Sequence, residues 1–429
     1  MPFLGGWKNK MVAANTALKS DTSSDYNVSA IRADFPALGL KINDYPLAFL
    51  DSGASAQKPV QVLDRMDKAY RLEYANVHRG AYTLSQLATD NYENARTTVA
   101  NFVKAKTPDE IIFTRNVTAA INLVAHSYGR TFLRAGDEII ISHMEHHANI
   151  VPWQLLRDAI GVEIKVVPVD DYGNFLMNEF EKLLCPKTKL VAVTQVSNVL
   201  GTILPIKKIV QQAHNAGAHV LIDGCQGIVH EGVDVQELDA DFYAFTGHKL
   251  YGPSGIGVLW GKLDLLNTMP PYEGGGDMIE NVTFEKTTYR EAPARFEAGT
   301  PPIVEAVGLA AAIDYMTGIG FQNIAIHENK LLAYATDGLT KIKGLRIIGQ
   351  ADIKAPIISF ELDGVHAHDI STIIDSKGVA VRAGHHCAQP LMDRFGLSAT
   401  ARASIGMYNN TEDIDQLIDA LNYVKEIFN

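Results

Sequence analysis

Short, nearly continuous apolar runs alternate with stretches of helical periodicity between about residues 85 and 310. Runs that stay apolar along their whole length are typical of strands buried on both faces of a mainly parallel sheet. The segment that Pro205 opens has an apolar face at helical spacing, and proline suits the first helical position because its missing N–H would be unpaired there. The pattern therefore predicts an α/β fold. The runs are EIIIS (138–142), EIKVVPV (163–169), KLVAVTQVS (189–197), HVLIDG (219–224) and DFYAF (241–245), and the helical face comprises Ile206, Ile209, Val210 and Ala213.

The pattern changes after about residue 325, which indicates a second, smaller α+β domain. A helix at roughly 326–342 is followed by the strands RIIG and PIISFEL, a further helix, VAVRAG, TARASIG and a last amphipathic helix. We predict a large domain over 51–310 and a small domain formed by 28–50 and 311–429. Residues 1–27 are rich in Ser, Thr, Asn and Asp and are predicted to be a disordered leader.

The composition excludes several classes of protein. A net charge of −11 argues against a nucleic-acid binder, which usually presents a basic face. Three cysteines are too few for a disulfide framework, and their odd number suits a reducing compartment, so we expect a cytoplasmic location. No apolar stretch approaches the roughly 20 residues that span a membrane, and the leader lacks the apolar centre of a secretory signal.

Two segments point to pyridoxal phosphate (PLP) chemistry. DGCQ (223–226) ends an apolar run, and FTGHKLYGP places Lys249 on a turn some twenty residues later. PLP withdraws electrons while its ring nitrogen stays protonated, which a carboxylate such as Asp223 ensures, and a lysine binds its aldehyde as a Schiff base. The alternative is that Lys249 is a solvated loop residue and Asp223 a helix cap.

Other polar motifs follow predicted strands, and ligands bind at the carboxyl ends of strands in an open α/β sheet. Thr118, with the N–H groups of Thr118 and Ala119, would lie at a helix N-terminus that can hold phosphate. The alternative is that Thr118 acts only as a helix cap. SNVLGTILP places Asn198 at the same edge. Thr246 and His248 can also bind phosphate. The convergence of four strand ends favours the cofactor hypothesis.

The segment SHMEHHANIVPW (142–153) carries three histidines after a predicted strand. His146 or His147 could stack on an aromatic cofactor and transfer protons, because imidazole titrates near neutral pH. A metal site formed by His143, His146 and His147 is an alternative, but no carboxylate set accompanies them, and we predict no metal.

The third candidate group is Cys387 in VRAGHHCAQPLM (381–392). A thiol next to histidines in a loop that contains Gly384 and Pro390 is expected to be exposed and to lose its proton readily. A nucleophilic thiol in a PLP enzyme suggests sulfur abstraction.

These motifs together resemble a SufS-type (group II) cysteine desulfurase of the class V aminotransferase-like PLP enzymes. The resemblance runs from about residue 31 to the C-terminus, and the short loop around Cys387 resembles the SufS-like group rather than the housekeeping group with its longer loop. It implies PLP fold type I, with a mainly parallel seven-stranded sheet flanked by helices. The motifs are LDSGASAQKP, NVHRGAYTLS, MEHHANIVPW, DGCQ, FTGHKLYGP, PPYEGGGDMI, RFEAGTP and RAGHHCAQP.

The resemblance also implies a role for each matching residue. Lys249 would bind PLP covalently, Asp223 would pair with the ring nitrogen, Gln226 with the phenolic oxygen, and His146 would stack on the ring. Phosphate would be held by Thr118, Ala119, Thr246, His248 and, from the second subunit of a homodimer, Thr300. The substrate carboxylate would be held by Asn198, Arg382 and Arg402, with His78 nearby, and the arginine fork matches that planar anion. Departures from the family pattern are Val117, Cys225 and Thr246; Thr246 keeps a hydroxyl, whereas the effect of Cys225 does not follow from the sequence.

The implied reaction converts L-cysteine to L-alanine and leaves a persulfide on Cys387. Because water would hydrolyse that persulfide, a sulfur acceptor of the SufE-like or SufU-like kind, working with Suf scaffold proteins in iron–sulfur cluster assembly, is expected. Nearly the same residues suit a selenocysteine lyase or a cysteine-sulfinate desulfinase. A non-catalytic PLP-binding scaffold is a remote alternative, and a Cys-dependent hydrolase would leave GHK and DGCQ unexplained.

Overall fold

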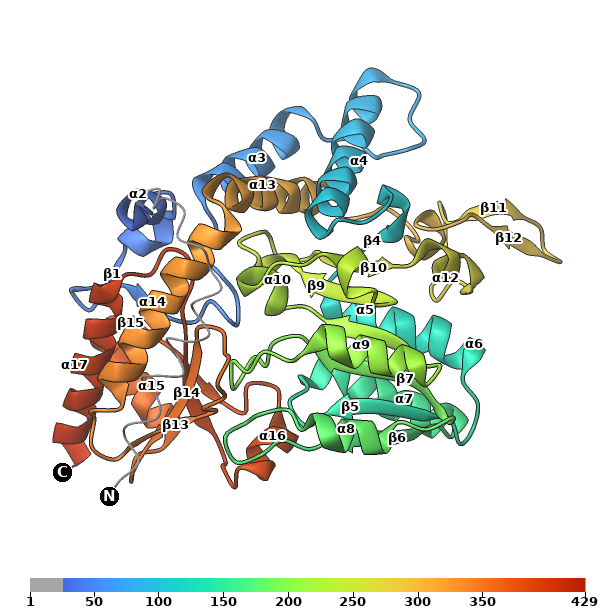
Figure 1. The fold of residues 1–429 in the computed structure, drawn as a ribbon. Coiled ribbons are helices and arrows are strands. Elements are labelled where there is room, and N and C mark those ends of the chain that lie inside the picture. The colour runs from blue at the N-terminus through green and yellow to red at the C-terminus, as the bar shows by residue number, and fades with distance from the viewer. Residues whose placement is uncertain (1–25, 429) are drawn as a thin grey trace.

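A seven-stranded sheet forms the centre of the larger part of the computed structural model, which describes residues 26–428 (Figure 1). The five strands β5 to β9 pair in parallel, and β10 runs antiparallel to both of its neighbours. The predicted mainly parallel α/β sheet is thus confirmed. In spatial order the strands are β4 (Ile111–Thr114), β10 (Gly257–Gly261), β9 (Phe242–Thr246), β8 (His219–Asp223), β7 (Thr188–Thr194), β5 (Glu138–Ser142) and β6 (Glu163–Val167).

The central strands are apolar over most of their length because both of their faces are covered. Along β5, Ile140 belongs to one hydrophobic cluster whereas Ile139 and Ile141 belong to the other, as alternation of side chains across a sheet requires. On one face α9 (Ile206–Asn215) buries the predicted apolar stripe, with Pro205 at the N-cap and not at the first helical position. The opposite face is covered by α5 (Val117–Leu123) and α7 (Val151–Ile160). Further short helices around the sheet are α6 (Arg130–Phe132), α8 (Met177–Leu183), α10 (Gly227–His230), α11 (Val235–Leu238) and α12 (Leu263–Thr268).

The smaller part is built on an antiparallel four-stranded sheet, as the α+β pattern predicts. Its strands, in spatial order, are β13 (Leu345–Ile348), β14 (Ile357–Leu362), β17 (Thr400–Ser404) and β16 (Arg382–Gly384). Two helices, α15 (Ala367–Asp375) and α17 (Thr411–Phe428), contribute to its core. The chain's early strand β3 (Ala48–Phe49) joins this part by pairing in parallel with β15 (Val379–Ala380). Smaller elements are α2 (Val28–Ala33), β1 (Lys41–Ile42), β2 (Tyr45–Pro46) and α16 (Gln389–Arg394).

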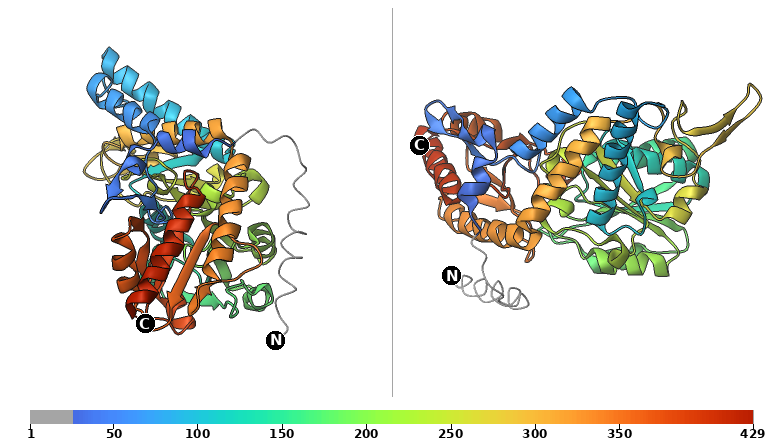
Figure 2. Two further views of the ribbon diagram at one scale, coloured as in Figure 1. Left: turned by 90° about the vertical axis from the view of Figure 1, so that its left-hand side faces the viewer. Right: turned by 90° about the horizontal axis from the view of Figure 1, so that it is seen from above.

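Two long helices connect the two parts. The helix α13 (Ile303–Ile319) packs on α3 (Val60–Leu72) and α4 (Thr83–Val103), and α14 (Phe321–Leu339) follows after a bend of 77° (Figure 2). The predicted boundary between residues 310 and 311 falls inside α13, and the domain boundaries stay a prediction. The expected leader lies, up to residue 25, outside the described residues. Within the described part no single helix is long and apolar enough to cross a membrane, and only α13 and α14 taken together meet that test.

A β-hairpin extends away from the large part (Figure 2). It comprises β11 (Ile279–Val282) and β12 (Thr287–Tyr289), and its tip carries the fully exposed Phe284. Val282 and Tyr289 are exposed as well. Apolar side chains held out in solvent in this way are common where another protein surface packs against them.

Candidate active site

The predicted cofactor residues meet at one edge of the large sheet because they follow neighbouring strands. His146 follows β5, Asn198 follows β7, Asp223 ends β8 and Lys249 follows β9 in a single 3₁₀ turn. These strands run in the same direction, so their carboxyl ends share an edge. One cavity is lined by all four of these residues together with Val117, Thr194, Val196, Cys225 and Gln226. The convergence expected of these strand ends is therefore present.

Two glycines allow the backbone to turn at this edge. A Cβ on Gly224, directly after Asp223, would lie 2.1 Å from the ring of Tyr243. A Cβ on Gly247, two residues before Lys249, would lie 2.7 Å from Ile256 and 3.0 Å from the carbonyl oxygen of Pro253. Larger residues would therefore displace the turns that present Asp223 and Lys249 to the cavity.

The Asp223 carboxylate is buried, and its Oδ1 accepts a hydrogen bond from the N–H of Cys225, two residues later in the same turn, at 3.0 Å. The Gln226 amide donates to the carbonyl of Gly53 at 2.8 Å, which joins this turn to the segment after β3. Burial raises the pKa of the Cys225 thiol well above its ordinary value, and the Asp223 charge adds to the effect. Cys225 is consequently a neutral thiol beside the cofactor cavity and a poor nucleophile.

The surroundings of His146 favour a neutral imidazole with its proton on Nε2. Its Nδ1 accepts the N–H of Ala148 at 3.0 Å, which leaves the ring proton on Nε2. Burial and the adjacent positive charge of Lys249 lower the pKa of His146 to about 4. A neutral ring with an Nε2–H is suited to stacking on a cofactor and to donating a proton. Within the described residues His143, His146 and His147 do not converge on a common point as metal ligands.

The phosphate candidates lie at neighbouring positions of the same edge. Thr118 is exposed in the first turn of α5, whose cap is Asn116 and not Thr118; the amide of Ala119 already donates to Asn116 Oδ1 at 2.9 Å. Thr246 ends β9 and donates to the carbonyl of Ile256 at 3.3 Å. Burial, followed by the charge of Lys249, lowers the pKa of His248 to about 4, so this ring is neutral and can offer a hydrogen-bond donor.

Both candidate arginines lie on the small sheet, where Arg382 of β16 is the cross-strand partner of Arg402 of β17. Arg402 is 2% exposed, donates to the carbonyl of Asn198 at 2.8 Å, and its Nε has no partner within the described residues. Burial lowers the pKa of Arg402 to about 10. A buried guanidinium with a free N–H beside the cavity can bind a carboxylate, which fits the predicted role in substrate binding.

Sequence reasoning missed Asp51, the acid that connects the two arginines. Its carboxylate accepts from Arg382 Nη2 at 2.8 Å and from Arg402 Nη2 at 3.4 Å. The hydrogen bond between Asp51 and Arg382 raises the pKa of Arg382. The signal was present in LDSGASAQKP, where an aspartate directly follows an apolar run, but it gains meaning only once the arginines are known to lie opposite it.

Cys387 is exposed, as predicted, in the loop between β16 and α16. Its thiol is close enough to Arg382 and Arg402 to act on the pKa of both. The loop backbone is not free of contacts, because the Asn198 amide donates to the carbonyl of His386 at 2.8 Å. The hydrogen bond between Asn198 and His386 therefore joins the loop of Cys387 to the rim of the cofactor cavity.

Thr300 and His78 are two of the predicted residues that do not line this cavity. Thr300 is exposed in the turn that precedes α13. The ring of His78 lies 2.9 Å from Glu93 and 3.2 Å from Asp277, and the hydrogen bond to Glu93 raises its pKa. Neither residue lines the cavity of this chain.

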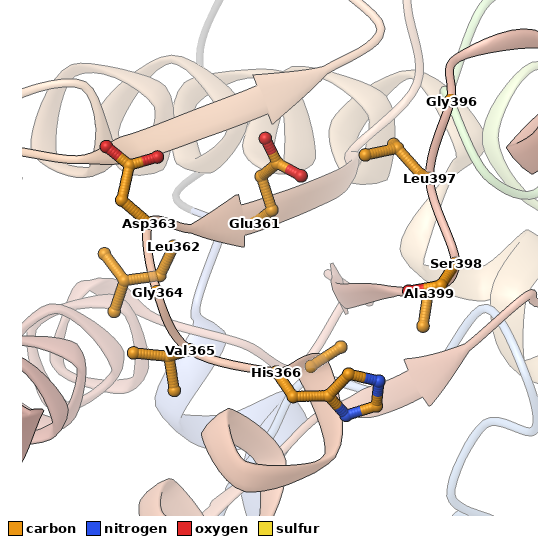
Figure 3. Close-up of a pocket in the computed structure, with 11 residues that line it drawn as sticks. Glu361, Leu362, Asp363, Gly364, Val365, His366, Gly396, Leu397, Ser398 and Ala399 are labelled. Atoms are coloured by element: carbon orange, nitrogen blue, oxygen red, sulfur yellow. The ribbon is translucent and has the colours of Figure 1, made fainter.

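A separate cavity of about 370 Å³ lies in the small part between the turn after β14 and the segment 396–399 (Figure 3). Glu361, Asp363 and His366 are among its lining residues, whereas none of the predicted site residues is. The candidate cofactor site is accordingly the cavity at the strand ends, where a lysine, an acid and a neutral histidine meet.

This fold and this site define a PLP-dependent enzyme. The sequence profile of the family "Aminotransferase class-V" matches residues 48–417. A cysteine desulfurase of Pectobacterium atrosepticum is 50% identical over 403 residues, which cover 94% of this chain and 99% of that protein. The crystal structure of the cysteine desulfurase CsdA from Escherichia coli superposes with a TM-score of 0.87 at 39% identity, covering 94% of this chain and 99% of the other. The apo structure of a cysteine desulfurase from Thermococcus onnurineus superposes with a TM-score of 0.88 at 38% identity, covering 92% of this chain and 97% of the other.

The chain therefore belongs to the aminotransferase class-V family, and within it to the group of the cysteine desulfurases. Its cofactor is PLP, which fits the residues present: a lysine at the cavity, a buried carboxylate at the end of β8 and a neutral histidine.

Proposed function

We propose that the protein is a SufS-type desulfurase that converts L-cysteine to L-alanine and keeps the sulfur as a persulfide on Cys387. The observation that carries this proposal is the position of the Cys387 thiol. It is exposed to solvent, yet its loop is bonded to Asn198 at the rim of the cofactor cavity and lies beside the two arginines.

The chain's residues divide the chemistry among them. Bound PLP supplies an electron-withdrawing ring that stabilises negative charge next to it. Asp223 keeps the proton on the ring nitrogen, and Lys249 Nζ is both the covalent attachment point and the base for the substrate's α-proton. The Nε2–H of His146 donates a proton within the site. Arg402 Nε and the neighbouring guanidinium of Arg382 hold the substrate carboxylate.

The sulfur step belongs to Cys387. Its thiolate attacks the substrate sulfur, an S–S bond forms, and the Cβ–S bond breaks with its electron pair passing to the carbon, which then takes up a proton. The balance is L-cysteine plus Cys387–SH giving L-alanine plus Cys387–S–SH, so no external oxidant or reductant is needed.

The decisive experiment compares the parent with Cys387→Ala, using Cys185→Ala as the matched control. After treatment with L-cysteine, mass spectrometry of the parent should show one extra sulfur on the peptide that contains Cys387. Cys387→Ala should still change the cofactor spectrum when cysteine binds but release little sulfide, and Cys185→Ala should behave like the parent. A persulfide on Cys225 or Cys185 would contradict the assignment. Turnover of selenocysteine by Cys387→Ala at the parent rate would favour a selenocysteine lyase.

We further propose a homodimer that completes each site with Thr300 of the second copy. Support comes from the exposure of Thr300 outside the cavity and from exposed apolar side chains on the large part. Such surface is usually covered in the functional assembly. The side chains are Leu63, Tyr70 and Leu72 of α3, Tyr74 and Tyr82 beyond it, Leu84 and Leu87 of α4, and Phe284 of the hairpin.

The sulfur is proposed to pass to a SufE-like or SufU-like acceptor and on to Suf scaffold proteins for iron–sulfur cluster assembly in the cytoplasm. The exposure of Cys387 supports a protein acceptor, because a buried persulfide would be unreachable. Three free cysteines in the described chain support a reducing compartment. Adding an acceptor protein should speed the parent several-fold and leave Cys387→Ala slow.

A further inference from the structure

His147, the neighbour of His146, fastens the loop that carries Cys387. Its backbone N–H donates to the carbonyl of Cys387 at 2.7 Å. Its ring Nε2 accepts the N–H of Gln389 at 3.0 Å. One residue of the segment after β5 thus holds the nucleophile's loop at two points, on either side of Ala388.

The loop needs such contacts because of its backbone conformation. His386 and Cys387 have φ angles of 52° and 55°, in the left-handed region that L-residues other than glycine rarely adopt. His386 is held by Asn198 and by Thr400, whose hydroxyl lies 2.8 Å from its Nε2. His147 provides the corresponding contacts for Cys387 and Gln389.

We propose that His147 is a positioning residue that aims the Cys387 thiol, through a neutral imidazole whose Nε2 accepts the amide of Gln389. This inference rests on the proposed function, because it assigns a task at the same site. It also explains why two adjacent histidines follow β5. The first, His146, lines the cofactor cavity, and the second, His147, holds the loop that carries Cys387.

The contact depends on the protonation state of His147. An imidazole accepts a hydrogen bond only at an unprotonated nitrogen. In a protonated ring Nε2 would carry a hydrogen that points at the N–H of Gln389, and the hydrogen bond would be lost. Burial, with the neighbouring His385 second, lowers the pKa of His147 and keeps the ring neutral. The titratable side chains beside it are His385 from the loop and His146 from its own segment.

The test compares His147→Leu, which removes the acceptor, with His147→Gln, whose amide oxygen can replace it. His126→Leu, the same change at an exposed histidine elsewhere, is the matched control. The first measurement is hydrogen exchange at the Gln389 amide in the cofactor-free protein. Loss of one hydrogen bond should speed this exchange roughly five- to tenfold in His147→Leu. His147→Gln and the control should stay within about twofold of the parent, since each keeps an acceptor for that amide.

The second measurement is turnover of L-cysteine by the PLP-loaded enzyme. In His147→Leu, kcat should fall roughly tenfold, as expected for one misplaced nucleophile, while KM changes less than about twofold. His147→Gln should restore most of the rate. In the parent the protection of the Gln389 amide should decrease as pH falls and His147 becomes protonated, and His147→Gln should lack this pH dependence.

The outcomes separate this inference from the proposed function. A parent that makes no alanine would refute the function, while the exchange data would still decide whether His147 holds the loop. Parent-like exchange and turnover in His147→Leu would overturn the inference. Equal damage in His147→Leu and His147→Gln would also overturn it, because packing of the ring and not its acceptor would then be responsible.

Discussion

Glu145 makes the stability of this protein depend on pH in a way that can be calculated. The side chain is 0% exposed beneath the cofactor site. Its Oε1 lies 2.5 Å from the Ser142 hydroxyl and accepts the N–H of Thr194 at 3.1 Å, and Oε2 accepts from Asn149 at 2.7 Å. Burial nevertheless raises the pKa of Glu145 from 4.5 to about 8. At neutral pH the group is therefore mostly protonated, and it adds no second negative charge beside Asp223.

The sign of the effect follows from proton binding. Between pH 4.5 and about 8 the folded protein holds a proton on Glu145 that the unfolded chain has released. Unfolding thus releases a proton, and stability decreases as pH rises through this range. At about 1.4 kcal/mol per pKa unit, the whole range is worth roughly 5 kcal/mol, of which about 3 kcal/mol falls between about pH 5.5 and 7.5.

Glu145→Gln should abolish this contribution, because an amide does not titrate. The substitution carries a cost that does not depend on pH, since one of the N–H groups of the new amide must face a donor. The difference in free energy of unfolding, variant minus parent, should therefore rise by about 3 kcal/mol as the pH is raised from about 5.5 to 7.5, because only the parent loses stability over this range. Urea unfolding at equal protein concentration measures this difference. Glu163→Gln, at an exposed glutamate, is the control and should follow the parent. Parallel curves for parent and Glu145→Gln would show that Glu145 is ionised in the folded state.

Three further outcomes are expected. Lys249→Ala should lose the covalently bound cofactor and all desulfurase activity while its circular dichroism stays that of the parent; alanine formation at the parent rate would refute the role of Lys249. Asp51→Asn leaves the buried Arg402 without its carboxylate partner, so urea unfolding should show a loss of about 3 kcal/mol, and a loss below about 1 kcal/mol would mean that water or another group replaces it. Light scattering should give a homodimer, and an active monomer at assay concentration would exclude completion of the site by Thr300.

The sequence by itself determined the order and class of the secondary structure. Apolar runs such as EIIIS and HVLIDG became the buried strands β5 and β8, because a strand covered on both faces favours apolar side chains along its middle and leaves polar ones to its ends. The expected convergence of Asp223 and Lys249 followed from one rule: parallel strands end at a common edge. Sequence spacing sufficed wherever a residue's place depends on its own strand.

Only the tertiary structure decided the contacts between residues distant in the chain. Asp51 meets Arg382 and Arg402 because β3, β16 and β17 come together in the small part, and His147 reaches the loop of Cys387 across 240 residues. The same holds for details of local geometry, such as the capping of α5 by Asn116 in place of Thr118. Hydrogen bonds and pKa values depend on which groups become neighbours and on how much water burial removes. A sequence motif fixes neither the hydrogen bonds nor the pKa values of its residues, so both are decided only when the chain is folded.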